Sequence, residues 1–295
     1  MSVQMKPASV EIRAMRQEDV ETSGRICYEA FKNIAERHNF PPDFPTPEAA
    51  IQLAQALYAS PQVFSVVAER DGRVVGSNHL WEYDEIRAVG PITIDVNAQA
   101  KGTGRKLMEA VIERGRSARG VRLVQDSFNG ASLSLYASLG FDVKEPLVLI
   151  EGAPGGDLPA GVEVRPVREE DYDACTELCR QAHGFARTGE LKNTPPFLTS
   201  FVAVRGGRVV AYSSAPHFWA LNHAVAETEE DMRAVLTGAA NLSDGRPLSL
   251  LLPTRQTDLF RWCLKKGMRV VKPMTLMTMG EYHEPRTPFL PSVGY

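Results

Sequence analysis

The chain has 295 residues, enough for about two domains, with 33 basic and 36 acidic side chains and a formal net charge of −3. The sequence lacks the basic excess of a nucleic-acid-binding protein and the ~20-residue apolar run of a membrane helix, so we expect no nucleic-acid or membrane partner. Met1–Ala8 lacks the pattern of a signal peptide, so we expect a cytosolic protein. Its cysteines, Cys27, Cys175, Cys179 and Cys263, form no C-x-x-C pair and are expected to be reduced thiols.

Strand and helix patterns alternate along Val10–Ile150. The expected strands are Glu11–Met15, Val63–Glu69, Arg73–Glu82, Ala88–Val96, Val121–Gln125 and Phe141–Ile150, and the expected helices run from Gln17 to about Arg37, from Pro47 to about Ser60, from Thr103 to Arg119 and from Ala131 to Ser138. Thr46 is placed to cap the second helix, because proline suits the first helical position that follows it. This order predicts an α+β fold with a mixed sheet flanked by helices.

The second half of the chain repeats the first. Three pairs of segments match in order: Val10–Asp19 with Val162–Asp171, Ala68–Gly76 with Ala203–Ala211, and Leu139–Val143 with Lys266–Val270. A repeat of this length indicates two copies of a whole domain rather than a short solenoid unit. We therefore expect domains at 9–152 and 160–283, joined by the Gly- and Pro-containing linker Pro154–Ala160, and a C-terminal tail at 284–295.

A strand, a polar turn and a helix in the segment Ile92–Met108 carry the clearest chemical signal. Gly102 and Gly104 let the turn curl so that successive N–H groups, and the positive end of the helix dipole, face one point. Lys101, Arg105 and Lys106 add formal charge, so the segment predicts an anion site suited to a pyrophosphate. The spacing fits neither a P-loop nor a dinucleotide fingerprint, because Arg105 and Leu107 stand where those motifs need lysine and glycine.

Gln99-Ala-Lys-Gly102-Thr-Gly104 resembles the Q/R-x-x-G-x-G/A motif of the GCN5-related N-acetyltransferases (GNAT), which bind acetyl-CoA. Further along, Asn129 to Phe141 is similar to the family's N-x-x-A-x-x-x-Y-x-x-x-G-F element, with Ser132 where alanine is common. The resemblance covers Val10–Ile150, and the rest of the chain only as a repeat. It implies two tandem GNAT-like domains, the first catalytic and the second degenerate.

The resemblance also implies roles for individual residues. Backbone groups around Ile92 and Ile94 would pair with the pantetheine arm, Asn129 would hold a pantetheine amide, and Tyr136 would face the thioester sulfur as general acid. The residues implied to cradle the pyrophosphate are Gln99, Lys101, Gly102, Thr103, Gly104 and Arg105. Each role has a structural alternative: Asn129 as a helix cap, Tyr136 as a core residue, and the glycines as ordinary turn residues.

The general base is not identified by the sequence. Several family members place a glutamate where this chain has Ala88, and the nearby candidates are His79, Glu82, Asp84 and Glu85, with proton removal through water equally compatible. No metal is expected, because Cys175 and Cys179 share a helix face without clustered histidines.

The second copy has lost the anion-binding pattern. Four acidic residues, Glu227, Glu229, Glu230 and Asp231, crowd the corresponding helix start, and no glycine pair precedes it. Cys263 stands at the position of Tyr136 and Gln256 at that of Asn129. We expect this copy to act as a scaffold that shapes the acceptor pocket, with His217, Trp219 and the tail as contributors.

Together these features predict an acetyl-CoA-dependent N-acyltransferase that moves an acetyl group to a primary amine, of a small molecule or a peptide, by direct attack on the thioester. The rival is a non-catalytic acyl-CoA-binding sensor or platform. A longer donor such as succinyl-CoA is compatible with the same residues. Neither the acceptor nor the oligomeric state follows from the sequence.

Overall fold

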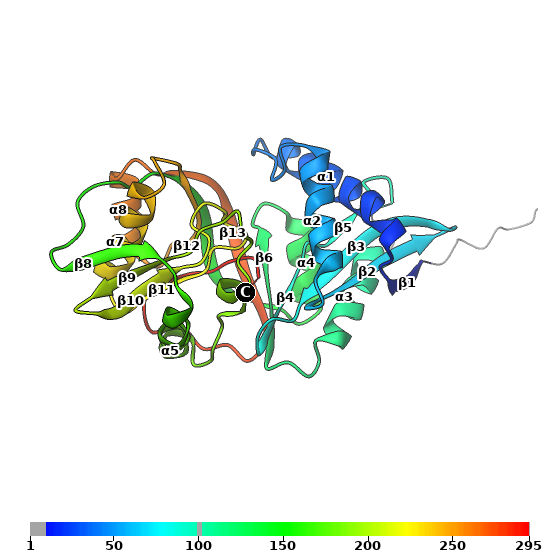
Figure 1. Cartoon of the computed structure of the whole chain (residues 1–295). Coiled ribbons are helices and arrows are strands. Elements are labelled where there is room, and N and C mark those ends of the chain that lie inside the picture. The colour runs from blue at the N-terminus through cyan, green and yellow to red at the C-terminus, as the bar shows by residue number, and fades with distance from the viewer. Residues whose placement is uncertain (1–9, 99–101, 295) are drawn as a thin grey trace, which may run out of the picture. The chain divides into compact units, whose positions relative to one another are not determined.

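The computed structural model describes residues 10–98 and 102–294 and divides them into two compact units (Figure 1). Unit 1 contains residues 10–82, 89–98 and 102–117, and unit 2 contains residues 83–88 and 118–294. Among the described residues, no helix combines the length and the apolar character needed to cross a bilayer. The domain boundaries expected from the repeat remain a prediction.

Unit 1 is an antiparallel sheet in the order β1, β2, β3 and β5, accompanied by three α-helices. Its elements are β1 (Glu11–Ala14), the 3-10 turn η1 (Gln17–Asp19), α1 (Val20–Arg37), α2 (Pro47–Ala59), β2 (Val63–Arg70), β3 (Arg73–Trp81), β5 (Thr93–Ile94) and α3 (Thr103–Arg114). The predicted cap of α2 is confirmed, because the Thr46 hydroxyl accepts a hydrogen bond from the Ala49 amide at 3.4 Å. The apolar stripe of α3, Leu107, Met108 and Val111, is fully buried.

The single strand predicted over Ala88–Val96 is wrong in detail. The chain forms β4 (Ile86–Val89) and the two-residue β5, separated by Gly90, Pro91 and Ile92. Proline has no N–H to give to a strand ladder, which explains the interruption. The predicted helix from Thr103 also stops early, at Arg114, because Gly115 follows as its C-cap.

Unit 2 holds two sheets. One is mixed, in the order β4, β6, β13, β7 and β12, with β4 and β6 parallel and the other pairs antiparallel; the second is antiparallel, in the order β14, β11, β10, β9 and β8. The remaining elements are β6 (Gly120–Asp126), α4 (Gly130–Ser138), β7 (Asp142–Gly152), β8 (Val162–Pro166), η2 (Glu169–Asp171), α5 (Tyr172–His183), α6 (Gly189–Lys192), β9 (Phe201–Arg205), β10 (Arg208–Ser213), β11 (Ala224–Ala226), α7 (Glu229–Asn241), β12 (Leu248–Pro253), α8 (Thr257–Lys265), β13 (Arg269–Gly280) and β14 (Phe289–Leu290).

The closing strands of the two repeats are exchanged. β13, which ends the second copy, lies between β6 and β7 of the first, with Met274 opposite Asp126. In return β7 lies between β13 and β12, with Leu250 opposite Ile150. A fragment that ended before the second copy would therefore leave β6 and β7 without the strand that joins them. The second copy is structurally part of the first copy's sheet, which goes beyond the scaffold role expected from the sequence.

Both repeats open with the same local structure. The Arg13 guanidinium binds the Asp19 carboxylate at 2.6 and 2.9 Å, and Arg165 binds Asp171 at 2.7 and 2.8 Å. In each copy the aspartate ends a 3-10 turn that leads into a long helix, α1 or α5. The sequence match between Val10–Asp19 and Val162–Asp171 thus reflects a repeated turn with the same ion pair.

Candidate active site

The turn before α3 presents an open helix N-terminus in unit 1. Gly102 is the N-cap residue with φ of +76°, a conformation that glycine adopts readily. Within the described residues no side chain caps the helix, and its first turn contains no acidic residue. The first N–H groups of an α-helix have no partner within the helix, so they and the dipole favour an anion at this point. Gln99 and Lys101 lie outside the described residues.

Basic side chains surround this helix start. Arg105 is exposed in the first turn of the helix, and its guanidinium lies 4.0 Å from the Glu109 carboxylate. The sequence reasoning missed Arg70, at the end of β2, whose guanidinium donates to the Thr103 hydroxyl at 3.3 Å. No sequence motif marks Arg70, because its position depends on the pairing of β2 within the sheet. Thr103 and Gly104 are buried, so their side of the turn packs against unit 1.

The strand segment implied to bind pantetheine has one free edge. Ile94 pairs with Gly76 of β3, and the Asp95 amide donates to the Val75 carbonyl at 2.9 Å. Ile92 precedes β5 in irregular backbone. Within the described residues β3 is the only strand that pairs with β5. The backbone groups on the other edge are therefore not used by a strand ladder, as the implied role of Ile92 and Ile94 requires.

In unit 2 the segment from β6 to α4 positions Asn129 and Tyr136. The Asn129 carboxamide oxygen accepts from the Ser132 amide at 3.2 Å and caps α4. Ser132 in turn donates its hydroxyl to Gln125 of β6 at 2.9 Å, which ties the helix start to the strand. Asn129 is thus a cap, and its NH2 group makes no hydrogen bond within the described part of the chain.

Tyr136 is buried and its hydroxyl is available. The side chain is 7% exposed, and its ring packs edge-on against Phe141 with centroids 6.3 Å apart. Burial, with a smaller contribution from the charge of Asp126, raises the pKa of Tyr136 above its ordinary value. No described residue hydrogen-bonds to the phenol oxygen. The phenol therefore holds its proton at neutral pH.

The carboxylates considered as a general base are engaged elsewhere. Glu82 binds Arg114 at 3.0 Å, Glu85 binds Arg119 at 2.6 Å, and Asp84 accepts from the Gly189 amide at 3.0 Å. His79 is buried, and its Nδ1 lies 2.8 Å from the Ser65 hydroxyl. Burial lowers the pKa of His79 to about 4, which makes it a weak base toward an amine whose pKa is near 10.4.

The matching helix of the second copy is closed to anions. The Thr228 hydroxyl caps α7 by accepting from the Asp231 amide at 3.2 Å, and it donates to the Asp231 carboxylate at 2.6 Å. Glu229, Glu230 and Asp231 fill the first turn, and Asp231 also binds Arg205 at 2.7 Å. These carboxylates offset the positive end of the helix dipole.

The positions that correspond to Tyr136 and Asn129 are also inert in the second copy. Cys263 is buried, and burial raises its pKa to about 12, so it is a thiol at neutral pH. The Gln256 side chain donates to the Phe289 carbonyl at 2.6 Å and so fastens β14. Both residues serve the packing of unit 2.

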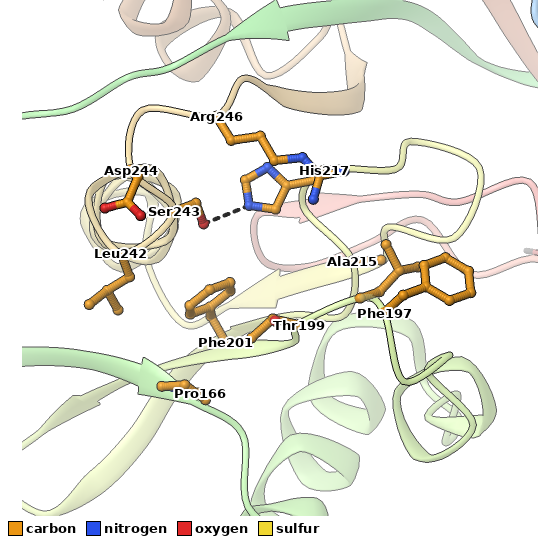
Figure 2. Close-up of a pocket in the computed structure, with 11 residues that line it drawn as sticks. Pro166, Phe197, Thr199, Phe201, Ala215, His217, Leu242, Ser243, Asp244 and Arg246 are labelled. Atoms are coloured by element: carbon orange, nitrogen blue, oxygen red, sulfur yellow. Dashed lines mark hydrogen bonds between the residues drawn. The ribbon is translucent and has the colours of Figure 1, made fainter. Parts of the chain in front are cut away.

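A pocket of about 440 Å³ lies in the second copy at the C-terminal end of α7 (Figure 2). Its wall includes His217, which is held by the Pro247 carbonyl at 3.0 Å and the Ser243 hydroxyl at 2.7 Å. Trp219, the other residue expected to shape an acceptor pocket, does not line it; its ring lies 5.4 Å from the Lys272 ammonium. The lining residues are Pro166, Phe197, Leu198, Thr199, Phe201, Ala215, His217, Leu242, Ser243, Asp244 and Arg246.

Comparison with known protein families gives a match within the part of the chain that carries the motifs. Residues 28–141 match the sequence model of the acetyltransferase (GNAT) family. No curated protein sequence matches the chain.

Solved structures match nearly the whole length of the chain. One is a protein from Pyrococcus horikoshii with an acetyltransferase assignment (15% identity, 95% of this chain and 92% of that one, TM-score 0.68). Others are a GCN5-related N-acetyltransferase from Sphaerobacter thermophilus (16%, 95% and 98%, TM-score 0.63) and a tandem GNAT protein from the clavulanic acid biosynthesis pathway (14%, 92% and 98%, TM-score 0.58). At these identities the likeness shows the fold, and it confirms the expected α+β tandem arrangement.

Proposed function

Because the chain belongs, through residues 28–141, to the acetyltransferase (GNAT) family, we propose that it transfers an acetyl group from acetyl-CoA to a primary amine. The observation that carries the proposal is the contrast between two equivalent helix starts. α3 begins with an uncapped left-handed glycine and no acid in its first turn, whereas α7 begins with a capping threonine and three acids. Only the first suits a pyrophosphate.

The residues of this chain fit acetyl-CoA. Gly102, Thr103 and Gly104 would offer backbone N–H groups to the pyrophosphate, with Arg105 as a nearby cation and Gln99 and Lys101 completing the motif. The free edge at Ile92 and Ile94 would pair with pantetheine, and the unused NH2 group of Asn129 would bind one of its amides. When bound, acetyl-CoA supplies an acyl group activated as a thioester.

Tyr136 would act as general acid. The amine nitrogen attacks the acyl carbon, the C–N bond forms, and the C–S bond breaks with its electron pair on sulfur. The protonated phenol of Tyr136 donates to that sulfur, a role that contributes about 10²–10⁴-fold in comparable enzymes. Because His79, Glu82, Asp84 and Glu85 are buried or engaged, we assign proton removal from the amine to water. The acceptor is a small-molecule or peptide amine.

The test is a CoA-release assay across a panel of primary amines. Gly102→Glu places a carboxylate at the helix start and should abolish amine-dependent release. Gly161→Glu is a matched control, because Gly161 has the same φ of +76° and likewise no described atom within 4 Å of an added Cβ, but it lies before β8. Release that survives in Gly102→Glu, or that falls equally in both variants, would contradict the assignment.

The same assay separates a catalyst from a CoA-binding module. Tyr136→Phe in a catalyst keeps affinity for CoA and lowers turnover. A sensor or platform would bind CoA but release no thiol with any amine. Acetyl-CoA and succinyl-CoA, run in parallel, report the acyl-chain preference.

A further inference from the structure

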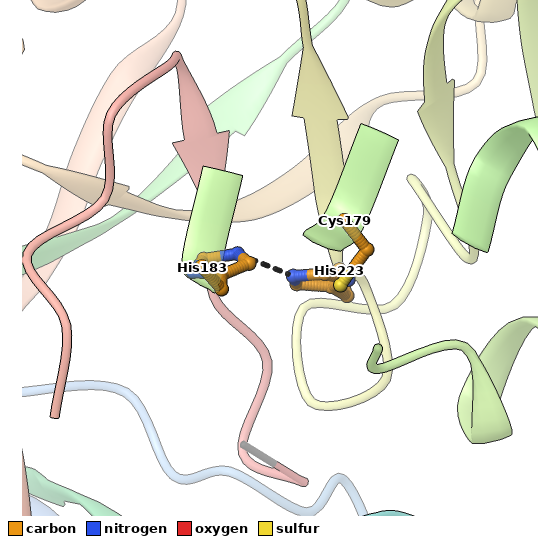
Figure 3. A group of neighbouring side chains, drawn as sticks. All are labelled: Cys179, His183 and His223. Carbon is orange, nitrogen blue, oxygen red and sulfur yellow. Dashed lines mark hydrogen bonds between the residues drawn. The ribbon is translucent and has the colours of Figure 1, made fainter. Parts of the chain in front are cut away.

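Three potential metal ligands converge in unit 2 (Figure 3). Cys179 and His183 lie one turn apart on α5, and therefore on the same helix face. His223 comes from the irregular segment just before β11. All three side chains are buried, and their ligand atoms lie within 4.8 Å of one another. None belongs to the acyl-transfer residues.

The spacing of the two imidazoles suits a tetrahedral ion. The Nε2 atoms of His183 and His223 are 3.3 Å apart. Zn–N bonds of about 2.0–2.1 Å in tetrahedral geometry separate two ligand nitrogens by about 3.3–3.4 Å. A zinc-bound sulfur, with a Zn–S bond of about 2.3 Å, lies about 3.6 Å from such a nitrogen. The Cys179 sulfur lies no more than 4.8 Å from the histidine ligand atoms, so a shift of roughly 1 Å at most would bring it into place.

A neighbouring tyrosine orients one of the two imidazoles. The Tyr212 hydroxyl lies 2.9 Å from His223 Nδ1; in the tautomer whose Nδ1–H donates to this hydroxyl, Nε2 carries the lone pair that would bind the ion.

Two arginines lie near the cluster. Arg187 binds Glu190 at 3.1 Å and also acts on Asp84, while Arg122 donates to the Glu281 carbonyl. Cys179 is a thiol that donates to the Arg187 carbonyl at 3.4 Å, because burial raises its pKa to about 12. Coordination to a divalent ion would displace this proton, so binding releases one proton.

We propose that Cys179, His183 and His223 bind one zinc-class divalent ion, which joins α5 to the segment before β11. The sulfur and two nitrogens are the donor set that zinc prefers, and a water molecule completes the tetrahedron. None of the three ligands belongs to the residues assigned to catalysis. Without a metal, the same groups would form a hydrogen-bonded core cluster, and the two cases predict different measurements.

The test uses tag-free, full-length protein, stripped with a chelator and titrated with Zn²⁺ or Co²⁺. We expect one ion per chain, release of one proton, and for Co²⁺ a sulfur-to-metal charge-transfer band in the near ultraviolet with intense d–d bands. Cys179→Ser should lose the charge-transfer band. Cys175→Ser is the matched control, because Cys175 is an equally buried thiol one turn earlier on α5 and should leave the spectrum unchanged.

His223→Gln provides a second variant that keeps a polar group near Tyr212, with circular dichroism to verify folding of each protein. It should weaken cobalt binding at least tenfold. If the unmodified protein takes up no metal and shows no cobalt band, the proposal is wrong. It is equally wrong if a folded Cys179→Ser or His223→Gln protein binds cobalt with the unmodified spectrum, because the ion would then lie elsewhere.

Discussion

A buried ion pair links the exchanged strand β13 to the end of β6. The Lys272 ammonium lies 2.7 Å from the Asp126 carboxylate, and the two side chains are 1% and 7% exposed. Replacing Lys272 by methionine keeps most of the side-chain volume but leaves Asp126 buried without its cation. Breaking a buried pair on one side costs about 3–5 kcal/mol, so we expect unit 2 to lose stability on this scale.

The expected loss can be expressed as a melting temperature. For a folded body of about 150–250 residues, 1 kcal/mol corresponds to about 2–4 °C, so Lys272→Met should lower the midpoint by roughly 6–20 °C. The matched control is Lys144→Met on β7. Lys144 binds Asp142 at 3.1 Å, but the two side chains are 30% and 73% exposed, so its loss should cost less than about 1 kcal/mol.

Thermal melts and urea titrations of both variants supply the comparison. The double variant Lys272→Met with Asp126→Leu should regain most of the lost stability, because no buried charge remains unpaired. Equal effects of Lys272→Met and Lys144→Met, or a double variant no more stable than Lys272→Met, would refute the argument from burial.

Three further predictions concern the site and the repeat. Tyr136→Phe should lower kcat about 10²–10⁴-fold with the KM for acetyl-CoA unchanged, measured by steady-state CoA release; unchanged kcat would remove Tyr136 as the general acid. Hydrogen bonding from Arg13 holds the pKa of Asp19 below its ordinary value of about 3.9, so the stability that Asp19 adds is present at neutral pH and is lost as pH falls through its folded-state pKa. Urea midpoints of the unmodified protein and Asp19→Asn should therefore converge toward acid, and a gap that widens there would contradict this sign. Thr228→Ala removes the cap of α7 and should lower the free energy of unfolding by about 1 kcal/mol in urea titrations. An unchanged free energy would show that the hydrogen bond from the Asp231 amide to the Thr228 hydroxyl does not stabilise the helix.

Local features of the fold follow from the sequence. The cap formed by Thr46 and the repeated turn at Asp19 and Asp171 depend only on residues a few positions apart, so their patterns predict them directly. The order of strands and helices is similarly local, because apolar periodicity reports which face of each element is buried.

The exchange of β7 and β13 could not be predicted in this way. Both strands carry apolar residues at their buried positions, as any central strand does. Periodicity shows which face of a strand is buried, but it does not show which strand is its neighbour. The position of Arg70 at Thr103 likewise depends on long-range pairing, in this case of β2 with its neighbours β1 and β3. The expectation that no histidine clusters with these cysteines was wrong, because His183 follows Cys179 by four residues and His223 joins them only through the fold.

The turn at Gly102 is the centre of the account, and calorimetry with acetyl-CoA tests it most directly. We expect one binding event per chain, at least tenfold weaker in Gly102→Glu, which corresponds to about 1.4 kcal/mol, and unchanged in Gly161→Glu. An absence of binding heat in the unmodified protein, or equal affinity in Gly102→Glu, would contradict the claim that this helix start holds the pyrophosphate.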